Sequence, residues 1–327
     1  MRAYLTRLAM GLGAGVAAAL LFLAALRGAP LGMALAYLAP LPVMIATLGW
    51  GYDAGLVALM CGSGLAAAIS PGYALLYGLL FAGPAWALAA FAANPAIYAK
   101  KPDDPAAPHR YPGPAALAIL AAALFILAGA IQLSLMWFGK GGYEGAVVAL
   151  SQEIRQALDE SGAARALPPD ISIDQLAQAV VQFAPTALST GATLMHLANL
   201  YLAARSVQLS QRLNRPWRDI PSGYVLPRWL AAPAALGLAL ALVGPSPADE
   251  YGLVVVGALG ALYALHGLAT LHALSRRAAS RPFMLAALYF ACAVAAQWVA
   301  PALAVLGLAE SFADLRGRAA RSLRPRT

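Results

Sequence analysis

Residues 8–26 read LAMGLGAGVAAALLFLAAL, nineteen consecutive residues without a charge. Because an α-helix needs about 20 mostly apolar residues to cross the hydrocarbon core of a bilayer, this run is predicted to be a retained membrane-spanning helix. The next run, Pro30 to Gly49, is one residue longer. Ala54 to Ala99 extends for 46 residues without a charge, which is long enough for two helices with a break at the SPG sequence that begins at Ser70.

Further apolar runs continue this pattern to the end of the chain. They are Pro114–Trp137, Thr186–Ala204, Trp229–Pro245, Tyr251–Leu274 and Pro282–Ala309. The last is too long for one upright helix, and we expect it to bend at Pro301 so that it enters the membrane and returns. The sequence predicts an all-α, polytopic transmembrane helical bundle with about 8 to 10 spanning segments, divided into a membrane half at 1–113 and another at 114–327.

The composition supports a membrane protein and argues against several other classes. The chain has 327 residues, of which 61% are hydrophobic and 11% charged, whereas soluble domains average about 45–50% apolar and about 25% charged residues. Its net charge of +8 would favour nucleic acid as the partner of a soluble protein, but here it fits basic cytoplasmic loops better, and we expect no nucleic-acid partner. Cys61 and Cys292 stand alone in apolar runs, so neither disulfides nor a thiolate metal cluster is expected.

The basic residues give the predicted orientation. If the N-terminus is cytoplasmic, thirteen Lys and Arg fall inside and four outside, before the tail at 311–327 adds five more arginines. Lys and Arg are enriched in cytoplasmic loops, so we expect a multi-pass protein of the bacterial inner membrane whose N-terminus and basic tail are both cytoplasmic. Two ends on the same side require an even number of crossings.

The longest polar segment, the loop at 138–183, is predicted to form amphipathic helices outside the cytoplasm. Val147, Leu150, Ile154 and Leu158 recur at helical spacing. After the LPPD break, Ser172 to Gln175 has the pattern of a capping box at the start of a second helix. The loop carries more acidic than basic residues, so anionic lipid is not its expected partner.

Polar side chains within the apolar runs are the candidates for ligand binding, because ionisable groups at membrane depth are costly and usually functional. All fourteen acidic residues fall in loops or at helix ends, which argues against ion-coupled transport. The ligand-binding candidates are His196, Asn199, His266, Thr270, Gln132 and Gln297. A two-histidine metal site would lack the third protein ligand such sites normally have, so no metal or other cofactor is expected.

A second group of candidates could contact a cytoplasmic partner. Arg215, Trp217 and Arg218 lie within the RLNRPWRD sequence, and Arg205 lies just before it. His272 lies one turn before the arginines that follow the run ending at Leu274. Arginines interleaved with aromatic residues suit a protein partner or an anionic lipid headgroup, and they equally suit an anchoring loop at the membrane interface.

The glycines at residues 11, 13 and 15 do not form a nucleotide-binding loop, because no strand precedes them. Small residues at Gly11, Gly15 and Ala19, and at Ala14 and Ala18, are predicted instead to form a close-packing ridge.

Several stretches together resemble one family. They are YLAPLPVMIATLGWGYDAGL (37–56), NLYLAARSVQLSQRLNRPWRD (199–219), HGLATLHALSRR (266–277) and LYFACAVAAQWVAPALAVLGLAESFADLRGR (288–318). The chain resembles the YybS-like family of uncharacterised bacterial membrane proteins, whose front half is similar to the substrate-binding S components of energy-coupling-factor transporters. That similarity implies a transmembrane coupling subunit facing small residues such as Ala14 and Ala18. S components usually have six helices, so the additional C-terminal helices depart from them.

Two functions therefore stay open. The protein is expected either to bind or transport a small molecule or lipid in its bundle without an ATPase of its own, or to act as an assembly or regulatory protein through its basic cytoplasmic loops. An enzyme is not expected, because the sequence has no nucleophile–base pair or metal triad.

Overall fold

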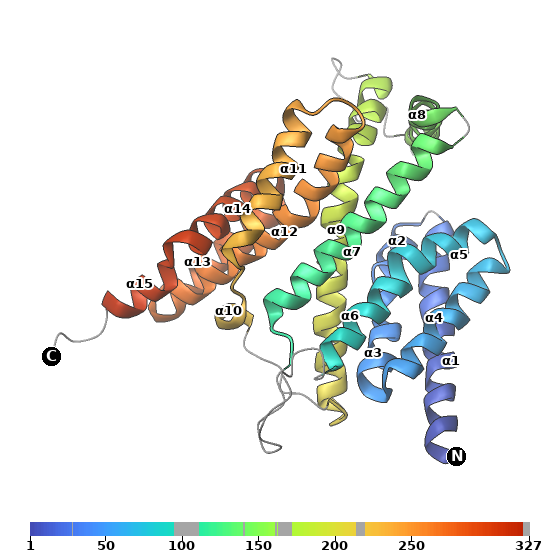
Figure 1. Ribbon diagram of the computed structural model, residues 1–327, viewed down its shortest axis with the longest axis horizontal. Coiled ribbons are helices and arrows are strands. Elements are labelled where there is room, and N and C mark those ends of the chain that lie inside the picture. The colour runs from blue at the N-terminus through green and yellow to red at the C-terminus, as the bar shows by residue number, and fades with distance from the viewer. Residues whose placement is uncertain are drawn as a thin grey trace. The chain divides into compact units, whose positions relative to one another are not determined.

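A computed structural model describes residues 1–27, 29–94, 111–139, 141–160, 162, 172–213 and 220–322, and no strand occurs among them. The all-α prediction is confirmed. The main helices (Figure 1) are α1 (Arg2–Ala24), α2 (Pro30–Ala36), α3 (Pro40–Trp50), α4 (Tyr52–Ala67), α5 (Pro71–Tyr77), α6 (Gly83–Ala93), α7 (Pro114–Phe138), α8 (Gly142–Glu160), α9 (Ile173–Leu209), α10 (Ile220–Gly223), α11 (Ala231–Val243), α12 (Ala248–Leu274), α13 (Arg281–Val294), α14 (Ala296–Ala313) and α15 (Leu315–Ser322).

Six helical segments in the described part of the chain are long and apolar enough to cross a membrane. They are Tyr4–Ala24, Leu31–Trp50, Pro71–Ala93, Pro114–Phe138, Ala248–Leu274 and Ala296–Ala313. Shorter apolar helices cover Tyr52–Ala67, Arg228–Val243 and Arg281–Val294. A polytopic helical bundle is therefore confirmed.

Helix ends follow the sequence at Ser70 and at the capping box before α9, and depart from it at Pro301. Ser70 caps α5 by accepting a hydrogen bond from Gly72 N–H at 3.3 Å, as the SPG sequence predicts. The last apolar run divides at Ala295, between α13 and α14, so the bend expected at Pro301 was wrong; Pro301 lies inside α14. The capping box before α9 is confirmed by bonds between Ser172 and Gln175 in both directions, at 2.8 and 3.1 Å.

The second amphipathic helix of the 138–183 loop was predicted as a separate element. The structure instead continues it into the next apolar run, because α9 is one helix of 37 residues with Pro185 inside it. The first amphipathic helix is confirmed as α8, whose residues are all at least partly exposed. The LPPD sequence lies outside the described residues.

The chain divides into two compact units that differ from the predicted halves at residue 113. Unit 1 contains residues 1–124, 192–226 and 262–327, and unit 2 contains 125–191 and 227–261. Three long helices, α7, α9 and α12, each contribute residues to both units.

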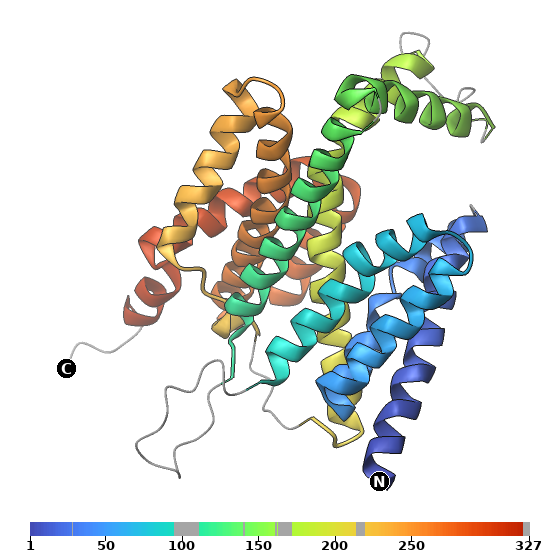
Figure 2. The ribbon, with the colours of Figure 1, turned by 45° about the vertical axis from the view of Figure 1, so that its right-hand side comes forward.

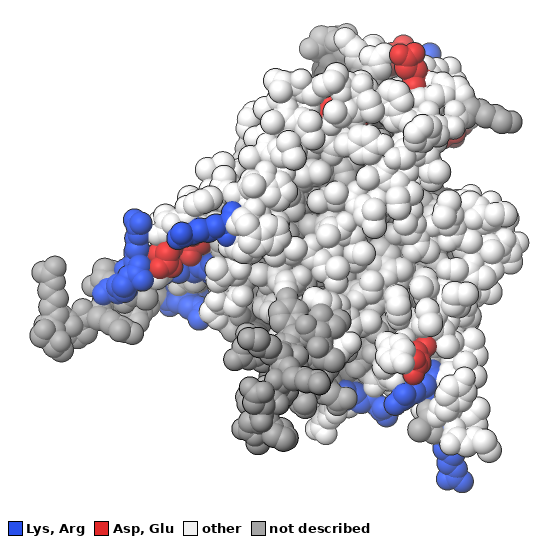
Figure 3. Space-filling model, viewed as in Figure 1, with Lys and Arg blue, Asp and Glu red and all other residues white. Residues whose placement is uncertain are grey.

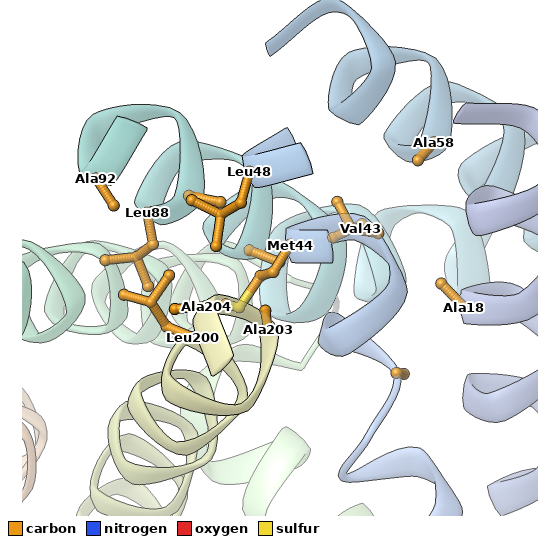
Figure 4. Close-up of a cluster of buried hydrophobic side chains, with 14 of the residues drawn as sticks. Ala18, Val43, Met44, Leu48, Ala58, Leu88, Ala92, Leu200, Ala203 and Ala204 are labelled. Atoms are coloured by element: carbon orange, nitrogen blue, oxygen red, sulfur yellow. The ribbon is translucent and has the colours of Figure 1, made fainter. Parts of the chain in front are cut away.

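Unit 1 is built on close helix packing. In Figures 1 and 2, α1, α3, α4 and α6 lie side by side, and α1 packs most extensively on α4. A Cβ at Gly11 or Gly15 would overlap the carbonyl oxygen of Ala54 or Ala58, respectively, so the predicted ridge packs against α4. Beside it, Met44 of α3, Leu88 of α6 and Leu200 of α9 meet in an apolar core (Figure 4).

Unit 2 joins α9 to α12 by hydrogen bonds between helices. Thr186 and Thr190 donate to the carbonyls of Leu253 and Gly257 at 3.2 and 2.9 Å. A Cβ at Gly257 would overlap Ser189 Oγ and the Thr186 carbonyl. Glycine at this position is therefore what allows the two helices to approach.

Candidate functional site

His196 and Asn199 are buried in unit 1, one turn apart on α9, as predicted. The ring nitrogens of His196 lie 3.0 Å from the carbonyl oxygens of Ala192 and Phe81. Asn199 Nδ2 donates to the carbonyls of Met195 and Tyr37 at 2.8 Å. Both side chains therefore tie α9 to the backbone of neighbouring segments.

The other ligand-binding candidates do not gather around these two residues. His266 and Thr270 are buried in unit 1 on α12, where the Thr270 hydroxyl donates to the His266 carbonyl at 2.9 Å. Gln132 and Gln297 are exposed, in unit 2 and unit 1 respectively. Among the described residues, no three His, Cys, Asp or Glu are grouped to hold a metal ion.

Of the cytoplasmic interface candidates, Arg215, Trp217 and Arg218 lie outside the described residues. Arg205 is exposed on α9 and donates to Gln208 Oε1 at 2.8 Å. His272 is partly buried, with Nε2 3.1 Å from the hydroxyl of Tyr289 on α13 and its ring edge-on to that tyrosine. This pair links α12 to α13.

A pocket of about 1030 Å³ lies in unit 1 where several helices end. The first turns of α1, the turn between α3 and α4, the end of α6 and the end of α9 all contribute to its wall. Its charged and aromatic lining consists of Arg7, Trp50, Tyr52, Trp86, Tyr111 and Arg212, together with Phe91. The buried histidines of α9 and α12 are not part of it.

Two glycines shape this wall. Gly51 forms the one-residue turn between α3 and α4 with a φ of 104°, a conformation that strongly favours glycine. A Cβ at Gly55 would overlap the Thr47 hydroxyl and press on the Trp86 ring. Trp86 Nε1 donates to the Tyr52 carbonyl at 3.0 Å, which fixes α6 to the turn.

The two arginines of the pocket are held differently. Arg212 follows Gln211, whose left-handed φ of 55° ends α9, and the Arg212 N–H donates to the Val207 carbonyl at 3.0 Å. Its guanidinium then lies over the Trp50 ring, 4.8 Å from the centroid. Arg7 pairs with Asp53 at 3.7 Å, and both side chains are about half exposed.

A second polar cluster in unit 1 is buried and lies where α12, α14, α15 and the segment at 220–224 meet. Arg316 Nε donates to Glu310 Oε1 at 2.7 Å, and the two side chains are 13% and 4% exposed. Its other nitrogens donate to the carbonyls of Pro221 and Tyr224 at 2.9 and 3.1 Å, and Nη2 lies 2.9 Å from His266 Nε2. We call these residues the Arg316 cluster.

Hydrogen bonding assigns the proton of His266 in the Arg316 cluster. A guanidinium has no acceptor, so His266 Nε2 must accept the bond from Arg316 and Nδ1 must carry the hydrogen. Nδ1 then donates to Ser311 Oγ at 3.4 Å, and Ser311 donates to the Gly307 carbonyl at 3.2 Å. Burial raises the pKa of the neighbouring Tyr224, so its hydroxyl stays protonated and donates to the Leu262 carbonyl at 3.2 Å.

Comparison with known proteins places the chain in one family. Residues 16–311 match the family described as predicted membrane protein (DUF2232). The chain belongs to this family. No curated protein and no solved structure matches it. For this DUF2232 protein, the family and the helices together establish a membrane protein.

Sequence reasoning identified His266 in this DUF2232 protein, but it missed the partners of His266 in the Arg316 cluster and did not predict the pocket. Glu310 does lie near a helix end, as predicted, but it is buried, and Arg316 looked like any other arginine of the tail. The available signal was a pair of glycines: a Cβ at Gly267 or Gly307 would overlap the carbonyl of Leu303 or Tyr263, respectively. That close crossing of α12 and α14 brings His266 to Ser311.

Proposed function

We propose that the protein binds a small molecule or lipid in the pocket of unit 1, as a transporter-like membrane protein without an ATPase of its own. The pocket carries this proposal. Ligand sites usually have volumes of about 300–1,000 Å³ and apolar walls with a few placed polar groups, and this pocket of about 1030 Å³ combines Trp50, Trp86 and Phe91 with two arginines.

The predicted binding residues support this choice of site indirectly. His196 and Asn199 direct their nitrogens at backbone carbonyls, an arrangement typical of polar side chains that join membrane helices. The pocket instead presents Arg7, which is about half exposed, and the exposed Arg212, so a ligand can reach both side chains.

The similarity to S components is part of this proposal, with one change. Ala18 is fully buried and Ala14 packs against the core of unit 1. That face of α1 is covered by the chain itself, so a coupling subunit would dock elsewhere, for example on the exposed face formed by Leu12, Val16 and Leu20. The positive-inside rule supports a cytoplasmic position for the pocket, since Arg7 and Arg212 line it.

A thermal-shift screen of the purified protein against metabolites, vitamins and lipids tests the proposal. A ligand present at 100 times its Kd stabilises the folded state by about 2.7 kcal/mol. Trp86→Leu should reduce the shift, because it removes a ring from the pocket wall. Trp298→Leu is the matched control, since Trp298 is exposed on α14 and does not line the pocket. A screen with no stabilising compound, or equal shifts in both variants, argues against the proposed function.

One observation favours the alternative, an assembly or regulatory protein. The Arg316 cluster holds α15 in place, and Arg318 and Arg321 remain exposed on that helix. Figure 3 shows Lys and Arg gathered around α15 and at the start of α1, whereas the sides of the N-terminal helices are uncharged. Crosslinking from Arg318→Cys should then capture one reproducible cytoplasmic protein. If no such protein is captured in cells where the tagged protein is functional, the result argues against an assembly or regulatory role.

A further inference from the structure

We infer that the pocket of unit 1 recognises an anionic group, a phosphate or carboxylate, attached to an apolar or ring-shaped body. The inference rests on the proposed function and specifies its ligand class. It depends on the charges that line the pocket, on how Arg212 is held, and on the aromatic residues beside it.

The charge of the lining selects an anion. Arg7 and Arg212 line the pocket, and none of its lining residues in the described part of the chain is acidic. A cationic ligand would meet two like charges with no carboxylate among the described lining residues, whereas an anion would gain charge-assisted hydrogen bonds. Asp53, which follows the lining residue Tyr52, is paired with Arg7.

Arg212 is prepared for such a ligand. Its guanidinium lies over the Trp50 ring, and no acidic residue pairs with it within the part of the chain that the structure describes. Stacking on an aromatic face leaves the planar N–H donors pointing outward along the edge, where they match the two oxygens of a phosphate or carboxylate. The left-handed residue Gln211 turns the chain so that Arg212 reaches this position.

Arg7 is the second cationic residue of the pocket, and it can exchange its contact with Asp53 for one with a ligand. Its contact with Asp53 is 3.7 Å long and about half exposed on both sides, and such pairs contribute little to stability. An incoming anion can therefore take over donors from Arg7 at small cost. The rings of Trp86 and Phe91 provide the surface for the apolar body of the ligand.

This chemistry has two sources, the headgroup of an anionic lipid and a soluble organic phosphate or carboxylate. To separate them, a single reactive cysteine reports on the pocket. Cys61 and Cys292 are replaced by alanine, and Ala90→Cys is introduced at a pocket-lining position. The rate of maleimide labelling is measured in phosphatidylcholine nanodiscs, in nanodiscs that also contain phosphatidylglycerol, and in the first type with 1-naphthyl phosphate or with neutral 1-naphthol. Arg318→Cys on exposed α15 is the control position.

We expect protection of Ala90→Cys, but not of Arg318→Cys, by phosphatidylglycerol or by naphthyl phosphate, and the arm that protects identifies the source. Arg212→Gln should raise the concentration for half protection by about 10- to 100-fold, the range for losing a hydrogen bond to a charged group. Arg212→Lys should fall between, because it keeps the charge and loses the planar fork. Arg205→Gln, on α9 but outside the pocket, should have no effect.

Two results would overturn the inference. The first result is that naphthol and naphthyl phosphate protect Ala90→Cys equally, and that this protection is unchanged in Arg212→Gln. The pocket would then bind neutral molecules, and the proposed function would stand. The second result is that no arm protects Ala90→Cys, while the thermal-shift screen finds stabilising compounds whose effect is lost in Trp86→Leu. This result would rule out an anionic ligand but leave the proposed function in place. If the screen also finds no compound, both the inference and the proposed function fail.

Discussion

Glu310→Gln is expected to weaken the docking of α15 against the helices that it contacts. Glu310 is 5% exposed; its Oε1 contacts Arg316, and its Oε2 accepts from the Leu315 N–H at 2.8 Å. Removing one charge of a buried ion pair costs about 3–5 kcal/mol because the other charge stays buried. The carbonyls of Pro221 and Tyr224 still accept from Arg316, so we expect the lower value. About 3 kcal/mol corresponds to roughly a 100-fold larger undocked population.

Limited trypsin digestion measures that population. An eight-residue helix such as α15 has little stability of its own, because isolated helices shorter than about 12–15 residues are marginal in water. Cleavage after Arg318 therefore requires undocking, and its rate follows the undocked population when docking is fast relative to cleavage. Mass spectrometry of the released peptide gives the rate at this bond.

Asp314→Asn is the matched control. Asp314 pairs with Arg321 at 3.1 Å, but the two side chains are 55% and 66% exposed, and exposed pairs contribute about 0–1 kcal/mol. Asparagine also tolerates the left-handed φ of 46° at this position. We expect a change of less than about fivefold in this variant. Cleavage rates in Glu310→Gln that match those of Asp314→Asn would refute the idea that the buried pair holds α15.

Three further predictions concern glycines and topology. Gly307→Ala should lower the free energy of unfolding by about 1–3 kcal/mol, because the new Cβ would overlap the Tyr263 carbonyl, whereas Gly260→Ala, with open space around it, should not; denaturation in mixed micelles measures both. Gly51→Ala should cost about 1–3 kcal/mol through its φ of 104° and weaken protection at the pocket, with the unhindered Gly64→Ala in α4 as the control. A reporter fused after Ser322 should be active only in its cytoplasmic form, and an exported reporter would contradict the predicted orientation.

The helices were predictable because their signals are local. Apolar runs of spanning length gave the bounds of α1, α7 and α12 to within a few residues at most ends, and proline marks the start of α7. The division at Ala295 has no such signal, since alanine favours helix and Pro301 nearby is the stronger breaker. Pro185 is the opposite case, a local breaker that does not end its helix. Packing of α9 against α12 through Thr186 and Thr190 keeps the helix continuous.

The polar sites were not predictable because they depend on distant pairs. Arg316 and His266 are 50 residues apart, and neither the charge of the tail nor the spacing of α12 indicates that they meet. Arg212 and Trp50 are 162 residues apart, in different predicted halves, and their contact requires the ends of α3 and α9 to lie together. Sequence reasoning identified Gly11 and Gly15 correctly because small-residue spacing needs no knowledge of the partner helix.

Uncharged polar residues and arginines have different roles in this protein, and the difference follows from the free-energy cost of placing a charge in hydrocarbon. Uncharged groups such as His196, Asn199 and Thr190 lie within helices and bond to backbone carbonyls of other segments, so each joins two segments. Exposing arginine to lipid is costly. A membrane protein can therefore present arginine to a ligand more easily at the ends of its helices, where the side chain can reach water. Arg212 therefore lies beyond the last turn of α9, and a site for an anion is expected there rather than among the histidines.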